Sequence, residues 1–208
     1  MKFVALNVVV SSIFSALFPA RCIRCNRIEK GLCNRCAQSL QIAAGAALPG
    51  VEQCWSAGPY SGWLRDSVLK YKSGQIDQLD GLIAVLHRVL QTADCSPELL
   101  VSIPSTIFKV RERGFDTVGE LSAGLAKQLK VPYRPVLQFA RKVQDQVGLD
   151  RESRAENLTG AFIAEQTMYG RAVLIDDVIT TGATVTTAAK VLRICGATKI
   201  FAISLCRT

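Results

Sequence analysis

The sequence predicts an α/β protein with a mainly parallel sheet flanked by helices, preceded by a small four-cysteine element. Three observations carry this prediction. Of the 208 residues, 49% are hydrophobic, so the chain can bury a sizeable core and is not disordered. From about residue 99 onward, short apolar runs alternate with helical patterns, which is typical of βαβ units. Two Cys-x2-Cys pairs stand close together near the N-terminus.

The amino-acid composition limits which catalytic mechanisms and ligands are compatible with this chain. The chain has a single histidine, His87, so catalysis by a Ser-His-Asp triad or a Cys-His pair has only this residue to use. No partner residues cluster around His87 in the sequence, and we expect it at the surface or boundary of its helix. The net charge of +8 favours phosphates, nucleic acid or an anionic surface without choosing among them.

The first apolar stretch, residues 3–18, predicts an amphipathic helix that ends before Pro19. Its apolar residues fall three or four apart, while Asn7, Ser11 and Ser15 lie off that stripe. The polar residues also argue against a membrane span, which needs roughly 20 apolar residues. A signal peptide is the alternative, with a poor cleavage context at Pro19-Ala20.

The two cysteine pairs predict a structural zinc site. Two closely spaced pairs hold one tetrahedral ion through four thiolates, closed here by a turn containing Gly31. The alternatives are two disulfides in a secreted protein or a redox pair. The other four cysteines stand in apolar contexts typical of buried thiols, which favours a reducing cytoplasm. The predicted zinc ligands are Cys22, Cys25, Cys33 and Cys36.

Positive charge is concentrated in the same element. Residues 21–36 hold five cations against Glu29 alone, which gives +4, half of the chain's +8. These cations have two interpretations: contact with nucleic-acid phosphates, or compensation of a four-thiolate zinc site that carries a charge of about −2. Neither is preferred from the sequence. The five cations are Arg21, Arg24, Arg27, Lys30 and Arg35.

The remaining helices and strands are predicted from the periodicity of the apolar residues and from Gly and Pro residues that end each element. The Ala/Gly-rich segment 40–49 predicts a linker with a short helix. We place the domain boundary there, with the N-terminal helix and zinc element in residues 1–48 and the α/β domain in residues 49–208. We expect strands at 54–60, 99–103, 172–175 and 199–205, and helices at 63–71, 76–91, 116–129 and 184–194.

The segment 171–184, RAVLIDDVITTGAT, carries the most specific chemistry. An apolar strand delivers Asp176 and Asp177 at its C-terminal edge, where ligands bind in open α/β sheets. The small, hydroxyl-rich turn 180–184 leads into a helix, so backbone N–H groups and threonine hydroxyls can bind one phosphate. Paired carboxylates suit a sugar diol or the water shell of Mg²⁺. The segment therefore predicts a ribose 5-phosphate site.

Two other interpretations of this segment are weaker. A strand ending in two aspartates is also typical of a Walker B element, but the chain contains no G-x-x-x-x-G-K-[ST] sequence. A plain strand-turn-helix with exposed acids does not explain why both acids and a hydroxyl-rich turn occur together.

These residues resemble a known family. The run 175–184 is similar to the 5-phosphoribosyl 1-pyrophosphate (PRPP) motif of type I phosphoribosyltransferases. With the four cysteines and three further segments, the chain resembles the ComF family, a bacterial competence-linked group similar to amidophosphoribosyltransferases. The further segments are Phe18-Pro19, Arg111-Glu112-Arg113-Gly114-Phe115-Asp116, and Arg154-x2-Asn157-Leu158-x2-Ala161-Phe162.

The resemblance implies a type I phosphoribosyltransferase fold that binds PRPP or ribose 5-phosphate with Mg²⁺, besides structural zinc. Residues 102–105 resemble the pyrophosphate-side loop, and residues 141–154 resemble the mobile loop that closes over PRPP. The implied catalytic residues are Asp176, Asp177, Arg113 and Lys142. The implied PRPP-binding residues are Asp176, Asp177, Thr180, Thr181, Gly182, Ala183, Thr184, Arg111 and Arg113.

The same resemblance implies a role in DNA uptake at the cytoplasmic face of the inner membrane, with single-stranded DNA and a competence helicase as partners. Two alternatives stand beside it: a metabolic transferase that moves phosphoribosyl to ammonia or a small nitrogenous acceptor, and a regulator that senses PRPP without turnover. Purine-salvage relatives carry a further acid where this chain has Thr180, and the loop 141–154 has no histidine. Enzymatic activity as a Mg²⁺-dependent pentosyltransferase is thus left open.

Overall fold

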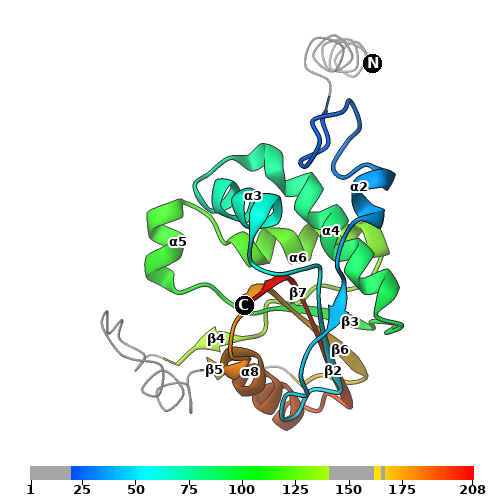
Figure 1. Ribbon diagram of the computed structural model, residues 1–208. Helices are drawn as coiled ribbons and strands as arrows, with labels where there is room; N and C mark the ends of the chain where they lie inside the picture. Colours follow the sequence, from blue (N-terminus) through cyan, green and yellow to red (C-terminus); the bar gives the residue numbers. More distant parts are fainter. Residues whose placement is uncertain (1–19, 141–161, 165–166) are drawn as a thin grey trace, which may run out of the picture.

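The computed structural model describes residues 20–140, 162–164 and 167–208. Its centre is a five-stranded sheet with the order β1-β2-β7-β6-β3 (Figure 1). The neighbours β2/β7, β7/β6 and β6/β3 are parallel, and β1 is antiparallel at one edge. The strands are β1 Ala43–Ala44, β2 Gln53–Ser56, β3 Leu99–Ser102, β6 Arg171–Ile179 and β7 Lys199–Arg207. The prediction of a mainly parallel sheet is confirmed.

Helices cover both faces of this sheet. Helices α3, α4 and α6 lie on one face and α8 lies on the other (Figure 1). A separate two-stranded antiparallel ribbon joins β4 (Gln138–Phe139) to β5 (Phe162–Ile163). The helices are α2 Asn34–Gln38, α3 Gly62–Lys72, α4 Leu79–Thr92, α5 Ile107–Arg113, α6 Thr117–Leu129 and α8 Ala183–Ile194, with a 3-10 turn at Ile76–Gln78.

The central strands bury both of their faces. Leu100, Val173 and Ile175 belong to the core under α3, α4 and α6, whereas Val101 and Leu174 belong to the core under α8. Successive side chains of a strand point to opposite faces, so a strand covered on both sides is apolar throughout. This is why short continuous apolar runs in the sequence predicted these strands correctly.

The four-cysteine element shares the core of the α3, α4 and α6 layer. Cys22, Cys33 and Cys36 are buried within that core. Lys30 also forms an ion pair with Asp80 at the start of α4, with its Nζ 3.1 Å from a carboxylate oxygen. The element is therefore packed against the α/β domain.

Four expectations need correction. The strand predicted at 54–60 is shorter, since β2 ends at Ser56. The short helix predicted within 40–49 is wrong, because this segment supplies the edge strand β1. Residues 107–113 form α5, which was not predicted. Strand β6 runs from Arg171 to Ile179, beyond the predicted 172–175, because β7 continues to pair with it as far as Arg207.

The predicted N-terminal helix and the loop 141–154, with Lys142, lie outside the described residues. Within the described residues, no helix is both long and apolar enough to cross a membrane.

Candidate functional site

Asp176 and Asp177 lie within the last four residues of β6, at the C-terminal edge of the parallel strands. Asp176 pairs in register with Ser204 of β7, and the Asp177 N–H donates a 2.8 Å hydrogen bond to the Asp176 carboxylate. The ladder continues past both acids to the pair Ile179 and Arg207. The acids are therefore held on a paired strand rather than on a loop.

Lys72, the last residue of α3, neutralises one of these acids. Its Nζ lies 2.7 Å from Oδ2 of Asp177, and the two side chains are only 22% and 14% exposed. Sequence analysis missed this residue. The only sequence signal was a lysine in the last turn of a helix, which ordinarily indicates a favourable interaction with the helix dipole.

The pKa of Asp176 is raised from 3.8 to about 7. Burial of the carboxyl is the largest cause, and the negative charge of Asp177 adds to it. The Asp177 N–H, Lys72 and Lys109 act in the opposite direction. Asp176 is therefore partly protonated near neutral pH, and a cation that binds its carboxyl favours the ionised form.

The turn after β6 presents the predicted phosphate loop. Gly182 has φ +79° and forms the N-cap of α8, which begins at Ala183. Because the N-cap is glycine, it has no side chain to cap the helix, and the N–H groups of the first turn beyond Ala183 have no side-chain partner among the described residues. Thr180 and Thr181 are exposed, and the Thr181 hydroxyl accepts a 3.3 Å hydrogen bond from the Ala183 N–H. Thr184 is half-buried in the first turn of α8.

Helix α5 carries three further cations, Lys109, Arg111 and Arg113. Lys109 is the α5 cation whose charge lowers the pKa of Asp176. Arg111 is exposed and Arg113 is half-buried, and among the described residues neither forms an ion pair with the acids. Thr106 caps α5 by accepting a hydrogen bond from the Lys109 N–H. The structure thus brings Lys72 and Lys109 to the acidic pair.

The sulfur atoms of Cys22, Cys25, Cys33 and Cys36 gather in one cluster, all within 4.8 Å of one another. Four sulfurs that each lie ~2.3 Å from a tetrahedral zinc ion are about 3.8 Å apart. The Cys25 and Cys33 sulfurs are 3.6 Å apart, so the cluster fits zinc with little movement.

The local turns that build this cluster follow from the sequence between the pairs. The Asn26 N–H donates to the carbonyl of Cys22 (2.9 Å), which closes the first knuckle. Asn26 and Gly31 both have positive φ, a conformation that asparagine and glycine tolerate best. The predicted turn through Gly31 is confirmed.

Backbone N–H groups prepare one thiol for ionisation. Burial raises the pKa of Cys22, but hydrogen bonds from the backbone of Cys33, Cys25 and Arg24 outweigh it and lower the pKa to about 6. Burial and the neighbouring sulfurs raise the pKa of Cys36 to about 12. A cation is therefore needed before all four sulfurs can be thiolates together.

All eight cysteines are free. Cys54, Cys95 and Cys206 are buried as expected, and Cys195 is half-buried. The disulfide interpretation of the cysteine pairs finds no support in this arrangement.

Comparison with known proteins places the chain among curated relatives. It is 32% identical over 109 residues to Competence protein F of Haemophilus influenzae, a match that covers 50% of this chain and 48% of that protein. It is 28% identical over 201 residues to DNA utilization protein YhgH of Escherichia coli K12, covering 90% of this chain and 88% of that protein. No family model matches the chain.

Solved structures give weaker likenesses. Glutamine PRPP amidotransferase from B. subtilis has a TM-score of 0.43 with 19% identity, covering 65% of this chain and 30% of that chain. Adenine phosphoribosyltransferase from Leishmania tarentolae has a TM-score of 0.43 with 13% identity, covering 79% and 94%. The sequence matches and the motifs confirm the predicted resemblance to the ComF family, since the chain is similar both to Competence protein F and to the YhgH proteins.

Proposed function

We propose that this chain is a phosphoribosyltransferase-like protein that binds PRPP or ribose 5-phosphate and acts in DNA uptake. One observation carries the ligand: Asp176, Asp177 and the Gly182 turn stand together at the carboxyl edge of the sheet. Such an edge is the usual ligand site of an open α/β sheet. The acids match the hydroxyls of a ribose, and the N–H groups of the turn match its 5-phosphate.

The donor set also fits Mg²⁺. Carboxylate oxygens and water are the ligands this ion prefers, and Asp176 and Asp177 would hold it together with the ribose hydroxyls. A bound Mg²⁺ would neutralise the charge of a pyrophosphate group. The residues of the chain do the remaining work: Lys109 lies near enough to Asp176 to act on its charge, and Lys72 balances Asp177 before the ligand arrives.

The role in DNA uptake is supported by the names of the relatives and by the basic four-cysteine element. The basic charge had two interpretations, contact with phosphates or compensation of the thiolates. We favour phosphate contact, because Arg27 and Arg35 are exposed without a carboxylate partner among the described residues. We propose that the zinc-loaded element binds single-stranded DNA and that a competence helicase is its partner in the cytoplasm.

Calorimetry with PRPP and Mg²⁺, followed by a pyrophosphate assay on the same sample, tests the ligand site. We expect binding that is lost in Asp177→Ala and kept in Asp66→Ala, which removes an exposed acid of α3 instead. Absence of PRPP binding by the wild-type protein would remove the central proposal. Pyrophosphate release in the presence of ammonia or a nitrogenous acceptor would favour the metabolic transferase, and binding without release would favour a non-catalytic role.

DNA affinity measured against salt tests the second half of the proposal. Each lost phosphate contact lowers the slope of log K against log salt by about 0.7 for a single strand. The double variant Arg27→Gln/Arg35→Gln should therefore bind more weakly, with a slope smaller by about 1.4. No DNA binding by the zinc-loaded protein at low salt would contradict this part of the proposal.

A further inference from the structure

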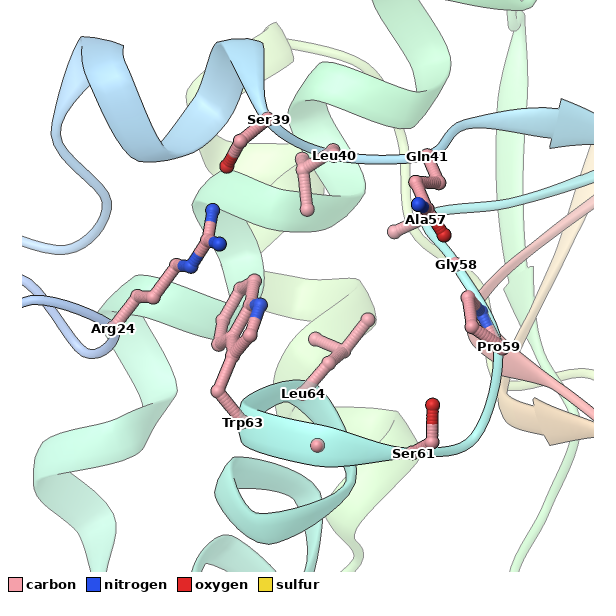
Figure 2. A pocket seen from close by; sticks show the side chains of 11 residues that line it. Arg24, Ser39, Leu40, Gln41, Ala57, Gly58, Pro59, Ser61, Trp63 and Leu64 are labelled. Atoms are coloured by element: carbon pink, nitrogen blue, oxygen red, sulfur yellow. The ribbon is translucent and has the colours of Figure 1, made fainter.

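A cleft lies between the four-cysteine element and the N-terminal end of α3. Its volume is about 220 Å³. Figure 2 shows Arg24 and Trp63 on one side, Pro59 on the opposite side, and Ser39 and Gln41 above Ser61. Nothing in the proposed PRPP site uses these residues.

The wall formed by Arg24 and Trp63 is a cation stacked on an aromatic ring. The guanidinium carbon of Arg24 lies 5.4 Å from the centre of the Trp63 ring. Arg24 is exposed, and among the described residues no carboxylate pairs with it. The guanidinium is thus held by the ring alone, and its N–H donors are free to meet an anion.

The rest of the cleft offers a slot with a polar edge. Gly62 has φ +54°, and the position where a Cβ would stand has no heavy atom within 4 Å, so the start of α3 leaves this space open. The exposed amide of Gln41 can both donate and accept hydrogen bonds. The Ser39 hydroxyl donates to the Cys36 carbonyl at 2.7 Å, which leaves its oxygen as an acceptor.

A second stacked pair lies close to the cleft in the sequence, although its arginine, Arg65, is also ion-paired with Asp66 at 3.3 Å. The guanidinium carbon of Arg65 lies 5.8 Å from the centre of the Tyr60 ring. Exposed arginines of the four-cysteine element, Arg27 and Arg35, add positive charge without carboxylate partners among the described residues. Aromatic rings interleaved with cations are typical of single-strand binding surfaces, where bases stack and cations follow the phosphates.

We propose that this cleft receives one unpaired base of a single-stranded nucleic acid, which replaces the guanidinium of Arg24 on the Trp63 ring while Arg24 turns to the adjoining phosphate. The base edge meets Gln41 and Ser39. The proposal deepens the DNA-binding part of the proposed function and rests on it. An acidic peptide would pair with the arginines but would bring no aromatic ring to stack on Trp63.

Tryptophan fluorescence of the full-length, zinc-loaded protein tests the base contact directly. The chain has two tryptophans, and the other, Trp55, packs on Phe201 in the sheet. The variant Trp55→Phe leaves Trp63 as the sole emitter. We expect oligothymidylate to quench this emission, and an abasic oligomer of equal length, which has the same phosphates, to leave it unchanged.

Affinity variants measured by anisotropy of a labelled oligothymidylate give the second readout. Trp63→Leu should weaken binding by about tenfold, the effect of losing one stacked base. Arg24→Gln and Arg27→Gln remove the same charge from the same element, and Arg24→Gln should cost more affinity because only Arg24 lines the cleft. Thermal unfolding of each variant checks that the fold is kept.

The outcomes separate this inference from the function it rests on. Equal binding of abasic and thymidylate oligomers without quenching would overturn the base site, while DNA binding would stand. Quenching by polyglutamate, or equal binding of duplex DNA, would also overturn it. Failure of every nucleic acid to bind at low salt would remove the DNA-binding proposal itself, and the base site with it.

Discussion

Lys72 reaches from the end of α3 to within 2.7 Å of Asp177 on β6, and both side chains are largely buried. The proposed ribose site is therefore not an open acidic pocket in the ligand-free protein. One of its two carboxylates is already neutralised by a lysine from a different element. Mg²⁺ or a sugar hydroxyl has to compete with this ammonium group for Asp177.

Replacing Lys72 should lower stability. In Lys72→Met, Asp177 loses its counter-charge in a half-buried place, and we expect the free energy of unfolding to fall by about 1–3 kcal/mol. The double variant Lys72→Met/Asp177→Asn removes both charges and should recover much of that loss. Urea unfolding of the wild-type protein, Lys72→Met, Asp177→Asn and the double variant gives the coupling energy. A coupling energy of zero would mean that the ion pair contributes nothing in solution.

Stability should depend on pH through Asp176. Its pKa is about 7 in the folded protein and has an ordinary value of 3.8, so the folded state holds a proton that the unfolded state releases. This contribution is fully present below pH 3.8 and is lost as pH rises through 7. Asp176→Asn should flatten the fall in unfolding free energy between pH 4 and 7. An unchanged slope in this variant would assign the effect to another group.

Ligand binding should have the opposite pH dependence. Mg²⁺ and PRPP require ionised carboxylates, so their affinity should rise as pH increases from 6 to 8. Asp177→Asn removes a charge that raises the pKa of Asp176, while Lys72→Met removes one that lowers it. Titration by calorimetry at several pH values should therefore place the transition higher in Lys72→Met than in the wild-type protein.

The turn at Gly182 should not tolerate a side chain. Its φ of +79° disfavours other residues, and a Cβ there would run into the side chain of Leu48. We expect Gly182→Ala to cost about 1–2 kcal/mol of stability and to weaken phosphate binding. Gly50, with φ +80° and only ordinary contact with Ala189, is the matched control. Gly50→Ala should carry the backbone cost and leave PRPP affinity unchanged, as calorimetry and urea unfolding can measure.

Removing the metal should destabilise the whole protein. Three of the four cysteines are part of the main core, so zinc binding contributes to folding directly. Cys25→Ser, at an exposed ligand, should lose zinc and about 3 kcal/mol or more of stability. Cys195→Ser lies outside the cluster and should keep one zinc ion per chain by chromogenic chelator assay. Full zinc content in Cys25→Ser would argue against the four-sulfur site.

The sequence was informative where local chemistry decides the structure. Three features were predicted correctly: the cluster of four cysteines, the strand before Asp176 and the start of α8. Each of them depends on residues that lie close together in the chain. Helix α5 was missed because none of its residues is buried, and even Ile107 and Phe108 are exposed. Its sequence therefore lacks the apolar stripe from which the other helices were predicted. Its signals were the cap at Thr106 and the positive-φ Gly114 that ends it.

The role of Lys72 was beyond sequence reasoning for a different reason. Its partner Asp177 lies on another element far along the chain, and only the packing of α3 on the sheet brings them together. The extension of β6 past the acids has the same origin, since β7 supplies the pairing. Such long-range contacts leave no periodic signal in either segment.

Helix α3 has a consequence for how the two proposed sites relate. Trp63 stands in its first turn and Lys72 is its last residue. Nine residues of helix separate them by about 14 Å, and Leu64, Val68 and Tyr71 fix the same helix to the core. The helix is thus a rigid spacer, and a ligand that spans both sites must match its length.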